Sequence, residues 1–385
     1  MMNPRDTKIR YIPGLDGLRG MAILLVMLFH TGIPNFRGGF TGVDIFFVLS
    51  GFLITSLLLS EVTEAGRINL KYFYMRRILR LLPALVLMLI IVTLTAQAMD
   101  LKGSAYTDFT SGIITLFYSA NWARAFNFHQ MGLLSHTWSL SIEEQFYMLW
   151  PLALIIMLRY VRREKRILNI VLLLSVLSWL LRMYLTQSGH TADRIFNGLD
   201  TRADALLAGC AAAIIRSTGL WTKRVSRLKS PAYAGFILPL VILFNISWSN
   251  HNMFFWVSFL LEFLTAVLIL HIVSDEKSMI KKFLTSKPLV WVGSISYGVY
   301  LWHDPVFEVM RYWGYSKLSI LFSGSIITLG IASVSYYLME KPLLRLKKSF
   351  QVKTTDFTCQ KPPVSNLPVM VEDKNSPLQP DKYFE

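Results

Sequence analysis

The chain has little cysteine and little charge. Its two cysteines, Cys210 and Cys359, fall in a predicted span and a predicted tail, so they form neither a disulfide framework nor a metal-binding motif. Charged residues make up 16% of the 385 residues, against about a quarter in soluble globular domains. No small-residue cleavage site follows the basic N-terminal stretch, so we expect a retained start rather than a signal peptide.

Apolar runs dominate the composition. Hydrophobic residues make up 53% of the chain, and the mean hydropathy is +0.44. Runs of about 17–22 apolar residues recur, which is the length of a transmembrane helix. We therefore predict an all-α polytopic membrane protein with about ten transmembrane helices. The expected spans are residues 16–34, 41–60, 82–98, 143–159, 167–186, 203–216, 231–248, 254–273, 289–306 and 317–339.

Acidic residues are fewer than basic ones, 24 against 39, which gives a net charge of +15. Lys and Arg cluster in the short connections between apolar runs, as the positive-inside rule requires. This distribution accounts for the charge without a nucleic-acid partner. Counting ten spans with both termini cytoplasmic places all five basic connections on the cytosolic side, and we predict that orientation.

Two segments depart from the regular pattern of spans. Residues 107–122 are apolar but short and rich in Ser and Thr. If they crossed the membrane, the basic segment RYVRREKR would lie outside, so we expect an outer-face or re-entrant helix. Composition divides the chain into a transmembrane domain, residues 1–348, and a disordered cytoplasmic tail, residues 349–385.

The first apolar run carries two ionisable residues, Arg19 and His30. They are eleven residues apart, so they lie about 20° apart around a helix axis and about 16 Å apart along it. Ionisable groups at membrane depth are costly and usually face the interior of a bundle. Asp44, in the second span, is expected near the level of His30, where a carboxylate can orient the imidazole. The alternative is that Asp44 only caps the second helix.

A group of arginines follows the first inner connection. Arg76 and Arg80 are four residues apart and Arg77 lies beside them, in the sequence MRRILRLLP. Positive-inside anchoring is the simpler explanation. The alternative is a set of guanidinium groups for the phosphates of a cytosolic anion, which Arg19 can join at the same level.

Polar residues also mark the outer side of later spans. Glu143 and Glu144 are adjacent at the outer boundary of the fourth span, and only one of them is expected to face a shared cavity because successive helix residues diverge by about 100°. For Arg202 and Asp204 an ion pair is the simpler reading. The further candidates on the acceptor side are Ser296, Tyr297 and His303, with Tyr300 between them.

Several ordered motifs resemble acyltransferase family three, whose members are bacterial integral-membrane enzymes that O-acylate sugars. The matching features are Arg19 with His30, GFTGVDIFFVLSGFLI, RRILRLLPA, HTWSLSIEEQFYMLWP, TRADALLAG, SYGVYLWH and a closing EKP. Their order and spacing cover roughly residues 11–345. Some members carry a fused extracytoplasmic hydrolase-like domain, and we expect this chain to be the type without it.

The resemblance implies ten spans, acetyl-CoA as the acyl donor and an acceptor hydroxyl on the far side of the inner (cytoplasmic) membrane of a bacterium. His30 matches the family's essential histidine and Arg19 its partner. Glu143 matches the acidic position of the WSL motif. The three arginines 76, 77 and 80 match a motif associated with acyl-CoA. We expect no metal and no permanently bound cofactor.

The sequence therefore predicts a membrane O-acetyltransferase that acts on an exported glycan, with lipopolysaccharide O-antigen or exopolysaccharide favoured. Expected partners are acetyl-CoA, the glycan or a lipid-linked sugar, membrane lipids and proteins of polysaccharide assembly. The main alternative is a proton-coupled transporter or flippase of an anionic solute, which also uses buried His, Asp and Arg. No inverted repeat of interrupted helices supports it. A non-catalytic partner of a polysaccharide synthase is a third reading.

Overall fold

The computed structural model describes residues 11–102, 106–161, 163–219, 229–246, 253–274 and 278–346. The regular structure in these ranges is entirely helical, which confirms the predicted all-α class. The described residues belong to one compact unit. The predicted disordered tail lies outside the described residues.

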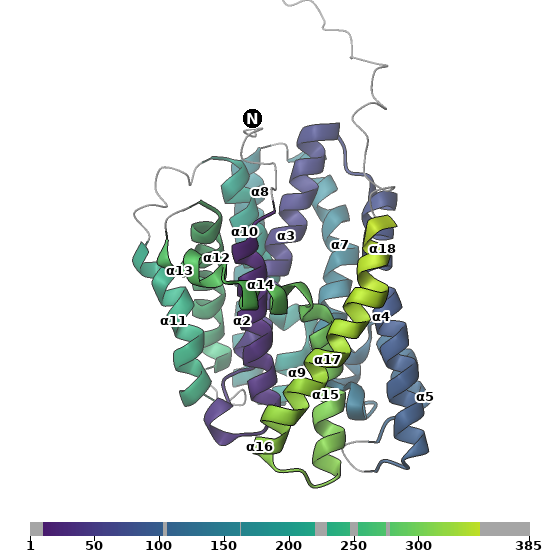
Figure 1. Ribbon diagram of the computed structural model, residues 1–385. Coiled ribbons are helices and arrows are strands. Elements are labelled where there is room, and N and C mark those ends of the chain that lie inside the picture. The colour runs from purple at the N-terminus through teal and green to yellow at the C-terminus, as the bar shows by residue number, and fades with distance from the viewer. Residues whose placement is uncertain are drawn as a thin grey trace, which may run out of the picture. The chain divides into compact units, whose positions relative to one another are not determined.

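The helices alternate in direction along most of the chain (Figure 1). The α-helices are α2 (Pro13–His30), α3 (Thr41–Ala65), α4 (Leu70–Ala98), α5 (Phe109–Leu116), α6 (Ala120–Ala125), α7 (Trp138–Tyr160), α8 (Glu164–Gln187), α9 (Ala192–Asn197), α10 (Leu199–Ser217), α11 (Lys229–Asn245), α12 (Ser258–Ser274), α13 (Met279–Leu284), α14 (Lys287–Ser294), α15 (Ser296–Tyr312), α16 (Lys317–Ser319), α17 (Ser325–Ser335) and α18 (Lys341–Leu346). Short 3₁₀ or π segments are η1 (Pro34–Phe36), η3 (Gly132–Thr137), η5 (Met253–Val257), η6 (Ile320–Gly324) and η7 (Tyr336–Glu340).

Seven helical segments of the described chain are long and apolar enough to cross a membrane. This confirms a polytopic membrane protein. The remaining three expected spans correspond to α10, to the shorter apolar helix α11, and to the pair α14 and α15, so a total of ten crossings stays a prediction. The seven segments are Pro13–His30, Pro34–Ala65, Leu70–Ala98, Gly132–Tyr160, Glu164–Gln187, Phe254–Ser274 and Lys317–Leu343.

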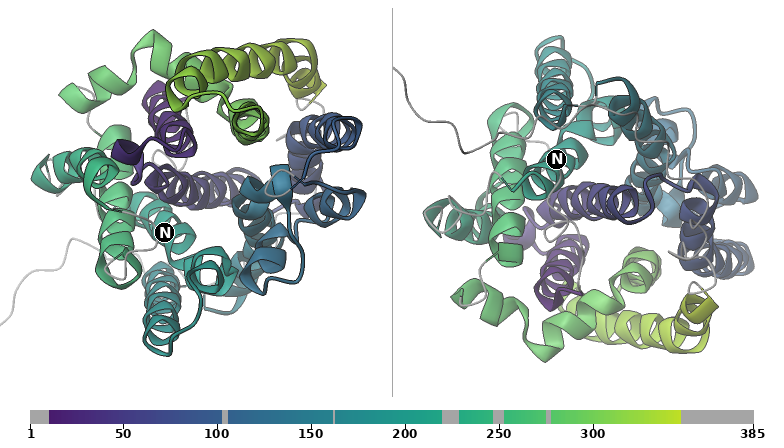
Figure 2. Two further views of the ribbon diagram at one scale, coloured as in Figure 1. Left: turned by 90° about the horizontal axis from the view of Figure 1, so that it is seen from below. Right: turned by 90° about the horizontal axis from the view of Figure 1, so that it is seen from above.

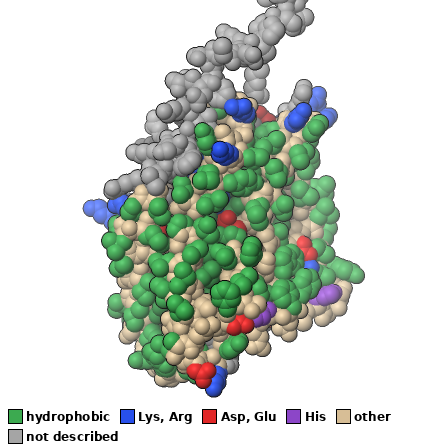
Figure 3. Space-filling view, turned by 90° about the vertical axis from the view of Figure 1, so that its right-hand side faces the viewer, with side chains coloured by type: hydrophobic (Ala, Val, Ile, Leu, Met, Phe, Trp, Pro, Cys, Tyr) green, Lys and Arg blue, Asp and Glu red, His purple; other side chains and the backbone are tan. Residues whose placement is uncertain are grey.

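The alternation gathers the described basic connections at the end of the bundle where α2 begins, at the top of Figure 1. On the face shown in Figure 3, Lys and Arg side chains also gather mainly at the upper end, above a largely hydrophobic surface. Such a separation is what the positive-inside rule leads one to expect. Which end meets the cytosol stays a prediction.

Helix α3 lies near the centre of the bundle, as both views of Figure 2 show. It packs against α10 with almost no space between the two backbones. A Cβ added at Gly51 would lie 1.9 Å from the Leu206 carbonyl oxygen, and one added at Gly209 would lie 2.0 Å from that of Val48. Glycine at both positions therefore permits the close crossing.

The ninth predicted span is not a continuous helix, which corrects that expectation. Helix α14 ends at Ser294 and α15 begins at Ser296, with Ile295 between them. Helix α14 packs closely on α2, because a Cβ at Gly293 would lie 1.8 Å from the Asp16 carbonyl oxygen. The break lets α14 stay on α2 while α15 continues toward the same end of the bundle as His30.

The structure agrees with the prediction that residues 107–122 do not span the membrane, since they form no helix long enough to cross it. This segment forms α5, which has eight residues and is about 12 Å long, and the beginning of α6. The Asp108 side chain accepts the Ser111 backbone N–H at 2.7 Å, and His129 Nε2 lies 3.2 Å from it. Burial raises the pKa of Asp108, but the bonds from Ser111 and the charge of His129 outweigh it and hold that pKa below its usual value.

Candidate functional site

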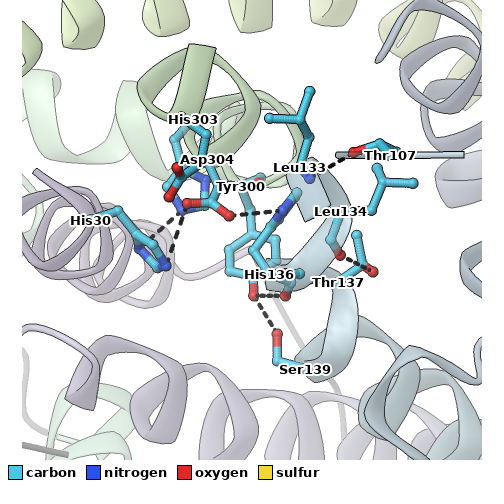
Figure 4. Close-up of polar contacts among 12 residues, drawn as sticks. His30, Thr107, Leu133, Leu134, His136, Thr137, Ser139, Tyr300, His303 and Asp304 are labelled. Atoms are coloured by element: carbon cyan, nitrogen blue, oxygen red, sulfur yellow. Dashed lines mark hydrogen bonds and ion pairs between the residues drawn. The ribbon is translucent and has the colours of Figure 1, made fainter. Parts of the chain in front are cut away.

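Three histidines and one aspartate meet near the end of α2 (Figure 4). His30 closes α2, His136 belongs to η3, and His303 and Asp304 lie on α15. His30 Nε2 is 3.7 Å from Asp304 Oδ1, and His136 Nδ1 is 3.4 Å from Asp304 Oδ2. His303 Nε2 is 3.3 Å from His30 Nδ1. We call these four residues the histidine cluster.

Backbone carbonyls fix the orientation of two of the rings. His30 Nδ1 lies 2.9 Å from the Val26 carbonyl oxygen, and His303 Nδ1 lies 2.7 Å from that of Tyr300. A carbonyl oxygen only accepts, so both Nδ1 atoms carry the proton in the neutral rings. The Nε2 lone pair of His303 then faces the His30 Nδ1–H. The Nε2 lone pair of His30 is left facing Asp304, on a side chain that is 23% exposed.

This arrangement suits His30 as a base that takes up a proton at its Nε2 atom. A proton taken up there makes an imidazolium whose charge faces the Asp304 carboxylate, and the Val26 carbonyl holds the ring in place. His30, His303 and Asp304 also offer ligand atoms within 4.8 Å of one another, a composition that suits a metal ion. The His30 Nδ1–H, however, is shared between the Val26 carbonyl oxygen and His303 Nε2, so the lone pair of His303 Nε2, a prospective ligand atom, already faces a donor.

The predicted contact between Asp44 and His30 is wrong. The Asp44 side chain accepts a hydrogen bond from Arg202, and both side chains are fully buried. Asp44 lies in the first turn of α3, but no side-chain cap bond is made there, so simple capping is not its role either. The strong attraction of the guanidinium on α10 explains why this carboxylate turns away from α2.

The sequence suggests an ion pair between Arg202 and Asp204, but these two residues do not pair with each other. Each pairs across helices: Arg202 with Asp44, and Asp204 with Arg182 at 2.7 Å. Arg182 Nη1 also lies 3.6 Å from Glu262. These five residues, which we call the ionic network, connect α3, α8, α10 and α12. Each buried charge faces an opposite charge on another helix, so we assign these residues to the scaffold rather than to the acceptor side.

A cavity of about 110 Å³ is lined by Arg19, Arg77 and Arg80. It thus brings together three of the four arginines predicted to meet, from α2 and α4. Arg76 is the exception, because its guanidinium is buried and lies 3.1 Å from Glu61. Arg76 therefore does not belong to the predicted arginine set. Its contact with Glu61 on α3 is structural. We call this space the arginine cavity.

Glu143 and Glu144 both line the arginine cavity, which corrects two expectations. Helix α7 begins at Trp138, so both carboxylates lie more than one turn inside the helix rather than at its boundary. Ser50 donates a hydrogen bond to Glu143 at 2.9 Å, and Arg77 lies 3.5 Å from Glu144. Both can face one cavity because it extends across the side of α7.

Tyr300 joins the arginine cavity to the histidine cluster. It lines the cavity together with Ser296 and Tyr297, all three on α15. The Tyr300 hydroxyl donates to the His136 carbonyl oxygen at 2.7 Å and also contacts the Ser139 hydroxyl (Figure 4). One turn further along α15 comes His303. Of the acceptor-side candidates, Ser296 and Tyr297 thus face the cavity, and His303 belongs to the cluster.

Sequence reasoning missed two members of the cluster, His136 and Asp304. Both stand inside motifs that the sequence singles out, HTWSL and YLWHDP. A histidine followed by an aspartate was a usable signal, because the pair sits one to two turns after Tyr297 and Tyr300 on the same helix. His136 precedes the regular part of α7, so periodicity alone could not place it near Asp304.

Comparison with known proteins gives consistent matches. The chain matches the acyltransferase domain family over residues 12–337. It is 38% identical to the peptidoglycan O-acetyltransferase OatA of Listeria monocytogenes, over 77% of this chain and 49% of that protein. It is 35% identical to the putative peptidoglycan O-acetyltransferase YrhL of Bacillus subtilis, over 87% and 55% of the two chains. It is 33% identical to the O-acetyltransferase OatA of Staphylococcus aureus, over 89% and 58%.

The chain therefore spans about half the length of the curated relatives that it matches. No solved structure matches it.

Proposed function

The chain belongs to the acyltransferase family whose domain it matches over residues 12–337, and we propose that it is a membrane O-acetyltransferase. The proposed reaction moves an acetyl group from cytosolic acetyl-CoA to a hydroxyl of a cell-wall glycan. The observation that carries the proposal is the arginine cavity joined through Tyr300 to the histidine cluster.

The arginine cavity is the proposed donor site. Arg19, Arg77 and Arg80 offer planar guanidinium groups that suit phosphate oxygens. Three guanidinium groups face two carboxylates there, so the cavity keeps a positive charge even if both Glu143 and Glu144 are ionised. In this proposal the phosphates of CoA lie against the arginines, and its pantetheine arm extends along α2 toward His30, about 16 Å away along the helix.

The proposed chemical step uses His30 as general base. Its Nε2 takes the proton of the acceptor hydroxyl while that oxygen attacks the thioester carbonyl carbon. The tetrahedral intermediate collapses, the C–S bond breaks, and the CoA thiolate leaves and takes up the proton. Asp304 stabilises the imidazolium in between, because its carboxylate lies 3.7 Å from His30 Nε2.

The rate enhancement expected from general-base catalysis can be compared with that expected from alignment of the substrates. General-base catalysis contributes typically about 10²–10⁴-fold. Alignment of donor and acceptor can contribute more, since effective molarities reach about 10⁵–10⁸ M for well-oriented groups. Arg19 of the proposed donor site and the base His30 are carried on one helix, α2, which holds their separation constant and so favours alignment.

The acceptor class follows from the relatives' names. Two of them are named for peptidoglycan, whereas the motifs alone favoured lipopolysaccharide O-antigen or exopolysaccharide. We therefore propose a peptidoglycan-type glycan as the first acceptor to test and O-antigen as the second. Mass spectrometry of both polymers, with and without the gene, would show an acetyl increment on one of them.

Replacing His30 tests the proposal directly. In membranes supplied with labelled acetyl-CoA and acceptor, His30→Ala should lower acetyl transfer by about 10²-fold or more. His129→Ala is the matched control, because His129 contacts Asp108 beside α5, away from the cluster. Turnover of His30→Ala equal to wild type, at equal amounts of folded protein, would refute His30 as the base.

A further inference from the structure

A second cavity, of about 290 Å³, lies between α4 and α7 beside the arginine cavity. Tyr74, Ile78 and Leu82 line it from successive turns of α4, and Met148 lines it from α7. Ile78 and Met148 are 46% and 48% exposed, so the cavity opens between them on the outside of the bundle. We call this opening the lateral mouth.

The inner end of the second cavity is polar. Arg77, Glu144 and Tyr147 line both cavities, as does Leu81. The Arg77 guanidinium stacks on the Tyr147 ring at 3.2 Å and lies 3.5 Å from Glu144. A single wall, centred on Arg77, therefore separates the lateral mouth from the arginine cavity.

The seam between α4 and α7 is held by side chains rather than by close helix packing. Helix α4 packs mainly on α5, α15 and η7, whereas α7 packs on α3, α6 and η3. The Tyr74 hydroxyl bridges the seam by donating to the Met148 carbonyl oxygen at 2.9 Å, and the Arg77–Glu144 pair lies further inside. Such a seam leaves room for a ligand between the helices.

The outward-facing surface of α4 and α7 is apolar along the bundle. Ile90 and Leu94 on α4 are 53% and 60% exposed, and Leu152 and Ile156 on α7 are 46% and 57% exposed. The face over α4 is largely hydrophobic away from its ends (Figure 3). In a membrane-spanning protein such a surface contacts lipid hydrocarbon. A molecule that reaches the mouth from this side must therefore itself be a lipid.

We propose that the second cavity binds a phosphate-bearing membrane lipid. One hydrocarbon chain lies in the lateral mouth against Ile78, Leu82 and Met148, and the phosphate meets the Arg77 guanidinium, whose fork suits phosphate oxygens. The lipid is a separate ligand from the cytosolic donor and approaches Arg77 from the opposite side of the shared wall. Binding of the lipid does not depend on the proposed transferase activity; only an effect of the lipid on transfer would rest on it.

The test measures lipid contact, so its failure is distinct from failure of the proposed function. The purified full chain is reconstituted in nanodiscs that contain phosphatidic acid with a photoreactive group in one acyl chain, and labelled residues are mapped by mass spectrometry. Labelling should concentrate on Ile78, Leu82 and Met148. Unlabelled phosphatidic acid should compete, whereas inorganic phosphate and glycerol 3-phosphate should not, which separates a lipid head from a free phosphate.

A tryptophan that fills the lateral mouth is compared with a tryptophan elsewhere on the same helix. Ile78→Trp should lower labelling of Leu82 and Met148 by about tenfold. Ile90→Trp, on the same helix and similarly exposed but outside the cavity, should leave labelling unchanged. If Ile78→Trp fails to fold, Met148→Trp replaces it and is expected to protect Ile78. Labelling spread evenly over the apolar surface, or equal in the two α4 variants, would overturn the proposal.

The phosphate contact is tested with a second lipid. Photoreactive diacylglycerol has the same chains without a phosphate, so it should label the mouth about tenfold less than phosphatidic acid, as expected from the loss of a charge-assisted hydrogen bond. Arg77→Gln should remove that difference. Equal labelling by both lipids in the wild-type chain would contradict a phosphate-bearing ligand.

Discussion

At the scale of single residues, two aspartates exchange the roles that the sequence suggests for them. The count of spans predicts that Asp44 lies near the level of His30. In the structure Asp44 instead accepts a hydrogen bond from Arg202 inside the bundle. Asp304 follows His303 in the motif YLWHDP, from which only the histidine is predicted as a site residue. Its carboxylate nevertheless lies 3.7 Å from His30. Counting spans predicts how deep a residue lies in the membrane. The direction of its side chain depends on which helices are neighbours.

Asparagine variants distinguish the two aspartates. Asp304→Asn keeps the shape but removes the charge that stabilises an imidazolium, so acetyl transfer per folded molecule should fall by about ten- to a hundredfold, or ~1.4–2.7 kcal/mol of transition-state stabilisation. Asp44→Asn should instead lower the yield of folded protein, because Arg202 would be left buried and unpaired. The measurement is specific activity of the monodisperse fraction, and a reversal of the two outcomes would contradict our assignment.

Metal removal tests the chemistry of the cluster. Because the His30 Nδ1–H is shared between the Val26 carbonyl oxygen and His303 Nε2 and leaves His30 Nε2 as the base, acetyl transfer should persist after treatment with EDTA and 1,10-phenanthroline. Metal analysis of the purified protein is the companion measurement. Activity lost to chelators and restored by one divalent ion would show that His30, His303 and Asp304 act as metal ligands instead.

At the scale of elements, the sequence predicts apolar segments well and their interruptions poorly. The short, non-spanning segment at 107–122 was predictable, because eight or so helical residues cannot cross a bilayer and the charge count allowed no extra span. The break at Ile295 was not, because no proline and no charged residue stands between residues 289 and 302 to mark it. It depends on the close contact of Gly293 with α2, which is a tertiary feature.

The N-cap of α5 gives a prediction at this scale. Asp108→Ala should destabilise α5 locally by about 1 kcal/mol, through loss of the bond from the Ser111 N–H. The pKa of Asp108 is lowered in the folded state, so its contribution is complete above about pH 4 and is lost as the pH falls through that lowered pKa. Hydrogen exchange of residues 109–116 in wild type and variant measures both effects. Exchange that is identical in the two proteins at neutral pH would contradict the capping role.

At the scale of the whole molecule, scaffold and site meet on α3 and otherwise use different helices. The ionic network joins α3, α8, α10 and α12, whereas the histidine cluster and arginine cavity are built from α2, α3, α4, α7, α15 and η3. Sequence motifs mark both sets, since GVDIFF and TRADALLAG carry members of the ionic network and HTWSL carries His136 of the histidine cluster. Only the packing shows which buried charges compensate one another and which face a cavity.

The ionic network contains three carboxylates and two guanidinium groups. Arg182→Gln leaves Asp204 and Glu262 without their cation, so it should destabilise the fold by about 3–5 kcal/mol. Glu262→Gln removes the excess negative charge and should change stability by much less. Thermal unfolding in one detergent compares them, and a larger loss for Glu262→Gln would contradict this balance of charges.

The close packing of α14 on α2 has a consequence for biogenesis. Helix α2 leaves the ribosome first, but the helix that covers its glycine-rich side is made near the end of synthesis. During translation the insertion machinery must therefore hold a span with an arginine and a histidine on one stripe, partnered at first only by α3. The histidine cluster is complete only when α15 has been made, so we expect translation products that end before α15 to lack acetyl transfer.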